Sequence, residues 1–153
     1  MLTLLATIII TSCSNSSHEK ALNGTWHGVS NITQNGIVMP LNTTLTLDDA
    51  SHEFKMQMDF SIADMGEFIS ITSEGNWSAD DTNILLIHNK DNIDVSISDN
   101  AKQFVPENTI DIVKQQLKEY MSSSLSSEET PYTLDDDILT INVCGQYTEF
   151  TRK

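Results

Sequence analysis

The strongest constraint on the fold is a regular alternation of apolar and polar side chains along most of the chain. Between residues 54 and 62 every second residue is apolar, and the residues between them are polar or charged. This period of two is typical of a β-strand with one buried and one wet face, because successive strand side chains point to opposite faces. The pattern recurs at residues 39–47, 93–98 and 139–143, and residues 66–77 and 82–88 also have strand character. We therefore predict a mainly β protein.

Short polar breaks separate the predicted strands, for example Gln34-Asn35-Gly36 and Asp135–Asp137. Connections this short allow hairpins between neighbours and leave no room for crossover helices. Closing such a sheet on itself removes its edges and buries its apolar face. We predict an antiparallel up-and-down meander closed into an eight- or nine-stranded barrel.

One segment, at about residues 106–125, breaks the alternation. Ile110, Val113 and Leu117 recur at helical spacing, and Pro106 suits a helix start. We expect an amphipathic helix inserted before the last strands. Its apolar stripe would pack on the barrel wall or close one end, and a partner-binding face is the alternative.

The N-terminal residues 1–12 carry no charged side chain and are mostly apolar, which suits the apolar part of a secretory signal. This run ends at Ser12-Cys13, ahead of a polar segment, and so resembles a bacterial lipoprotein signal. The resemblance implies cleavage before Cys13 and a lipid on its thiol, which would anchor the protein to a bacterial membrane in the cell envelope, periplasmic or at the cell surface. The alternative is a buried strand with an ordinary thiol. We divide the chain into a signal peptide (1–12), a polar tether (13–21) and a barrel domain (22–153).

The start of the domain carries Leu22, Gly24, Thr25 and Trp26, and its end carries the strand at residues 147–152. With the one-sided meander between them, the chain resembles the lipocalin-like, or calycin-type, lipoproteins of bacteria. In lipocalins the tryptophan packs at the barrel base under an arginine that follows the last strand. The resemblance therefore implies that Arg152 stacks on Trp26 as structural residues of the barrel base. In lipocalins proper the long helix follows the last strand, whereas here it precedes the last strands.

The predicted inward face is rich in methionine and phenylalanine. These flexible and aromatic side chains could line a site for a small apolar ligand. An eight-stranded barrel lies near the boundary between a filled and a hollow interior. We expect a solid or nearly solid core, with a ligand cavity as the alternative. The possible ligand-lining residues are Met39, Phe54, Met56, Met58 and Phe60.

The charge balance narrows the possible partners. Eight basic and 22 acidic residues give a net charge of −14, which argues against binding to nucleic acid. The chain has no Gly-rich phosphate loop, nucleophile elbow or His-Glu-x-x-His motif, so we predict no catalytic residue and no cofactor. We expect a non-enzymatic, monomeric, lipid-anchored envelope protein, which would bind a small apolar ligand if the barrel interior is hollow. The alternative is an interaction module or inhibitor whose acidic surface binds a basic protein.

The potential metal ligands are scattered. The four histidines lie on different segments without paired spacing, and we interpret each as a surface or turn residue. Acidic clusters such as Asp48-Asp49 and Asp80-Asp81 lack an EF-hand spacing and are interpreted as turn formers. We therefore predict no metal site. If Cys13 is lipidated, Cys144 has no disulfide partner, and its place at a strand end favours a buried, inert thiol.

Overall fold

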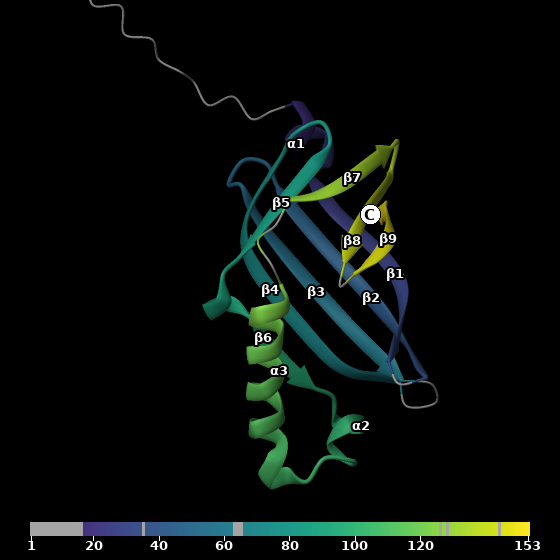
Figure 1. Ribbon diagram of the computed structural model, residues 1–153, viewed down its shortest axis with the longest axis vertical. Coiled ribbons are helices and arrows are strands. Elements are labelled where there is room, and N and C mark those ends of the chain that lie inside the picture. Colours follow the sequence, from purple (N-terminus) through teal and green to yellow (C-terminus); the bar gives the residue numbers. More distant parts are fainter. Residues whose placement is uncertain (1–16, 35, 63–65, 126, 128, 144) are drawn as a thin grey trace, which may run out of the picture.

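The computed structural model describes residues 17–34, 36–62, 66–125, 127, 129–143 and 145–153. Its main element is a closed antiparallel barrel of eight strands, with one further strand outside (Figure 1). Neighbouring barrel strands follow chain order, and the last strand pairs with the first. The predicted up-and-down barrel is confirmed. The barrel strands are β1 (Gly24–Gln34), β2 (Ile37–Asp48), β3 (Glu53–Ile62), β4 (Gly66–Ala79), β5 (Asn83–His88), β7 (Glu129–Asp135), β8 (Ile138–Val143) and β9 (Gln146–Arg152).

Acidic side chains form the turns between strands, as their sequence context predicts. The Asp80 carboxylate accepts hydrogen bonds from the backbone N–H groups of Thr82 at 2.8 Å and Asn83 at 2.7 Å. Asp48 accepts two similar bonds in the turn between β2 and β3. These backbone hydrogen bonds lower the pKa of both carboxyls, because they stabilise the charged form. The two carboxylates therefore act as local turn formers.

The barrel wall changes character after β5. The long strand β4 pairs with β5 through its second half and with β6 (Asp94–Ile97) through its first half. A 3-10 turn, η1 (Lys90–Asn92), separates β5 from β6 along this shared edge. On the other side, β5 pairs with β7 through residues 83–85 only. The chain thus leaves the barrel wall here, and the helical insertion follows.

The insertion contains α2 (Asp99–Lys102), the 3-10 turn η2 (Glu107–Thr109) and α3 (Ile110–Ser124). The helix predicted at about residues 106–125 is confirmed. It lies against β6 (Figure 1). Its Met121 side chain is buried in the core. No helix within the described ranges is long and apolar enough to cross a membrane.

A short helix, α1 (Ser17–Leu22), covers the barrel base. Residues 17–21 of the predicted polar tether (13–21) belong to this helix, which buries Leu22 completely and almost buries Glu19. The Trp26 indole N–H donates to the carbonyl oxygen of Leu22 at 2.8 Å and so joins the helix to β1. Residues 1–16, including Cys13 and the predicted signal peptide, lie outside the described residues.

Arg152 at the end of β9 completes the base. Its guanidinium carbon lies 4.1 Å from the centroid of the Trp26 ring. It also donates to the carbonyl oxygens of Ala21 at 2.7 Å and Asn23 at 2.5 Å, two of the carbonyls that the end of α1 leaves free. This is the contact between first and last strand that the lipocalin resemblance implies.

Candidate ligand-binding cavity

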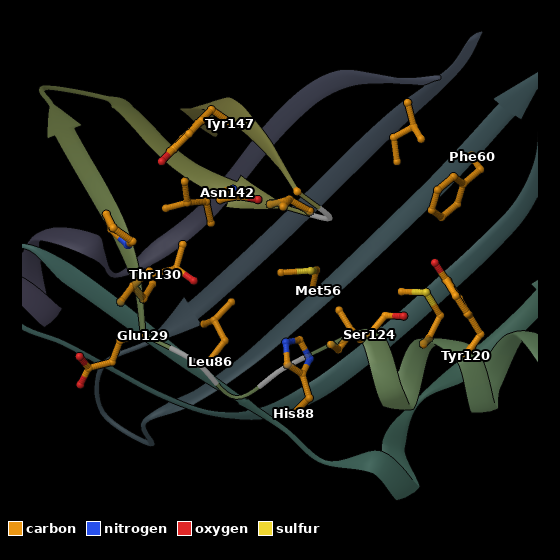
Figure 2. Close-up of a pocket in the computed structure, with 18 of the residues that line it drawn as sticks. Met56, Phe60, Leu86, His88, Tyr120, Ser124, Glu129, Thr130, Asn142 and Tyr147 are labelled. Carbon is orange, nitrogen blue, oxygen red and sulfur yellow. The ribbon is translucent and has the colours of Figure 1, made fainter. Parts of the chain in front are cut away.

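A cavity of about 670 Å³ lies in the barrel interior where the wall meets α3 (Figure 2). Its volume is within the range of about 300–1,000 Å³ that is usual for small-molecule sites. The deep wall is apolar and comes from β3, β5 and β8. Its residues are Met56, Phe60, Ile84, Leu86, Ile141 and Val143.

Unequal strand lengths explain why this part of the barrel is hollow. Strands β2 and β4 have 12 and 14 residues, whereas β8 and β9 have six and seven. The short strands close only part of the barrel's height, and β9 pairs with β1 through three residue pairs. Two side chains near the end of α3, Met121 and Leu125, complete the cavity wall. The cavity is therefore bounded partly by strands and partly by the helix.

The five predicted lining residues divide into two groups. Met39, Met56 and Phe60 line the cavity. Phe54 and Met58 do not line it, although they share the inward face, and they lie in the packed core at 3% and 0% exposure. We expected the whole interior to be filled. It is filled around Phe54 and Met58 and hollow beside α3.

His88 is a lining residue that the sequence analysis placed wrongly. Its Nδ1 lies 2.7 Å from the hydroxyl oxygen of Ser73, which is fully buried. The Phe54 ring packs edge-on against the imidazole, with 4.9 Å between the centroids. Burial lowers the pKa of His88 to about 4, because the charged form loses hydration, so the ring is neutral at pH 7. The alternation Ile84, Leu86, His88 was the available signal that this histidine faces inward.

The mouth of the cavity is more polar than its interior. Tyr120 on α3 and Tyr147 on β9 line it and are 64% and 71% exposed, so the cavity is open to solvent on this side. Ser124 and Asn142 contribute hydroxyl and amide groups to the lining. A ligand with an apolar body and one polar group fits a cavity whose deep wall is apolar and whose mouth is polar.

The potential metal ligands among the described residues lie apart from one another. Within the described residues, no group of three or more His, Cys, Asp or Glu side chains could hold a metal ion. His27 lies on the outer face of β1, where its Nδ1 and the Thr44 hydroxyl are 3.0 Å apart, and His52 lies at the turn before β3. Cys144 lies outside the described residues.

The sequence matches no protein-family model and no curated protein. The closed barrel is compatible with a lipocalin-like fold. A fold of this kind does not by itself determine function, which depends on the site that it carries.

Proposed function

We propose that this protein is a non-enzymatic binding protein that holds a small apolar molecule in the barrel cavity. The observation that carries the proposal is a cavity of about 670 Å³ with an apolar deep wall and a polar mouth open to solvent. Removing apolar surface from water favours binding by about 25 cal/mol per Å². Binding would need no covalent chemistry.

We further propose that the protein is a lipocalin-like lipoprotein, held in the cell envelope by a lipid on Cys13. The support is the apolar run that ends at this cysteine. Because α1 begins at Ser17, the four intervening peptide units span at most about 14 Å. The barrel base, where α1 lies, would therefore sit close to the membrane.

Uptake of the apolar fluorophore N-phenyl-1-naphthylamine by the purified protein tests cavity binding. Met56 is buried and lines the cavity, so Met56→Trp should fill it and weaken uptake at least about tenfold. Val29→Trp is the matched control, because Val29 is 70% exposed and does not line the cavity. It should leave uptake unchanged, and circular dichroism should show both variants folded.

Salt dependence separates cavity binding from binding at the acidic surface. Uptake into an apolar cavity should change little as salt rises, whereas contacts between exposed charges are screened beyond about 8 Å at physiological ionic strength. Uptake that Met56→Trp leaves intact would contradict the proposal. Function would then be sought on the outer surface, starting with a basic protein partner.

A further inference from the structure

The neutral imidazole of His88 places a polar atom in an otherwise apolar part of the cavity wall. Its Nδ1 is paired with the Ser73 hydroxyl. Among the residues that the structure describes, none forms a hydrogen bond with the second ring nitrogen, Nε2. The ring points into the cavity between Leu86 and Met56 (Figure 2). A polar atom in such surroundings favours a guest that offers it a hydrogen bond.

The ring is held in this orientation by its neighbours. Ser73 is fully buried on β4 and fixes Nδ1, and the Phe54 ring on β3 packs nearly perpendicular to the imidazole, with 4.9 Å between the centroids. Turning Nε2 away from the cavity would break the Ser73 contact. The nitrogen is therefore preorganised for a partner inside the cavity, which lowers the ordering cost of binding.

The charges around the cavity favour an uncharged guest. None of the described lining residues is Lys or Arg, whereas Glu129 is at the rim and the whole chain carries a net charge of −14. A carboxylate would enter without a cationic partner and against this field. A cation would lose its hydration beside apolar side chains without an acidic partner in the deep wall.

Resting on the proposed binding function, we infer that the ligand is a neutral amphiphile with an apolar body and a hydroxyl group that hydrogen-bonds to Nε2 of His88. A hydroxyl can both donate and accept. It can therefore pair with Nε2 in either tautomer of the imidazole. The contact between Nδ1 and the Ser73 hydroxyl does not fix the tautomer, because that hydroxyl can also donate or accept. His88 would bind the hydroxyl group of the ligand, and the apolar cavity wall would contact the apolar body of the ligand.

Displacement of N-phenyl-1-naphthylamine at pH 7.5 by three probes of equal chain length tests this inference: 1-decanol, decanoate and decane. Decanol should displace the fluorophore at a concentration at least about tenfold below that of decanoate. His88→Leu should weaken the binding of decanol about 5- to 30-fold, the range expected for one hydrogen bond in a cavity. The affinity for decane should stay unchanged or increase. His88→Gln, which keeps an amide near the Nε2 position, should restore part of the decanol affinity. His27→Leu, on the outer face, is the matched control.

Each alternative outcome has a distinct meaning. Equal losses of decanol and decane in His88→Leu would overturn the hydrogen bond and leave His88 a packing role only. Decanoate binding more tightly than decanol would overturn the preference for an uncharged guest. In both cases fluorophore uptake by the wild-type protein would persist. A wild-type protein without any uptake would instead refute the proposed function itself.

Discussion

Replacing Arg152 with alanine should destabilise the barrel by about 3 kcal/mol. Stacking on Trp26 at 4.1 Å contributes about 1 kcal/mol. The hydrogen bonds to the carbonyls of Ala21 and Asn23 contribute about 1 kcal/mol each, after a reduction for the partial exposure of the guanidinium. The ion pair with Asp137 adds about 0.5 kcal/mol at most, because that carboxylate is 77% exposed. Most of the loss therefore comes from the contacts with Trp26 and α1.

Urea unfolding followed by far-UV circular dichroism measures this loss. In urea we expect an unchanged m value. In thermal unfolding followed by the same signal we expect a melting temperature lower by roughly 6–12 °C for a chain of this length. Arg152→Lys should lose about 1–2 kcal/mol, because one ammonium cannot contact both carbonyls and the ring together. Asp137→Ala removes only the ion pair and serves as control. If Arg152→Ala cost no more than Asp137→Ala, the proposed role of Arg152 at the barrel base would be refuted.

Two further predictions concern His88 and Cys13. Because the folded-state pKa of His88 is about 4 and its ordinary value is 6.5, the unfolded chain binds this proton more readily between these values. The contribution of the neutral His88 side chain to the free energy of unfolding should be complete above pH 6.5 and fall as the pH drops towards 4. Urea titrations at several pH values should show that His88→Leu removes this part of the pH dependence. An unchanged pH dependence in His88→Leu would contradict the lowered pKa of His88. Cys13→Ala should release the protein from membranes in a fractionation experiment, and continued membrane association would refute the lipid anchor.

The barrel could be predicted from the sequence because several strands show by their alternation which of their faces is buried. The alternation at residues 54–62 needs no knowledge of the partner strand to show which side chains are inward. Helix α1 could not be predicted in the same way. Its six residues have no apolar periodicity. It is held by tertiary contacts, namely burial of Leu22 and hydrogen bonds from Arg152 to the carbonyl of Ala21 and to that of Asn23, just after the helix.

The cavity was only partly predictable, since alternation identifies an inward face but not the space in front of it. Met56 and Met58 occupy equivalent positions in the β3 pattern, yet only Met56 borders the cavity. The difference depends on what lies across the barrel. There β8 and β9 end early and α3 completes the wall, and neither strand length nor helix position follows from β3 alone.

Gly75 links strand pairing to the orientation of His88. In the sheet it lies between Phe54 on β3 and His88 on β5, and its missing side chain allows these two rings to meet across β4. A Cβ at this position would collide with the carbonyl oxygen of Ile87 and lie 3.0 Å from the Phe54 ring. Gly75→Ala should therefore cost about 3 kcal/mol in urea unfolding, against about 1 kcal/mol for Gly36→Ala, where a left-handed φ of 81° is strained but the space is open.

The same substitution should also alter ligand choice. Displacing the Phe54 ring removes the edge-on contact that holds the imidazole, so Nε2 of His88 loses its fixed direction into the cavity. At a temperature where Gly75→Ala is still folded, it should weaken the binding of decanol more than that of decane, whereas Gly36→Ala, which lies outside the cavity lining, should leave the ratio of the two affinities unchanged. A Gly75→Ala protein that is destabilised but keeps the wild-type ratio would show that Ser73 alone orients the ring. Strand pairing and hydrogen-bond selection would then be independent properties of this barrel.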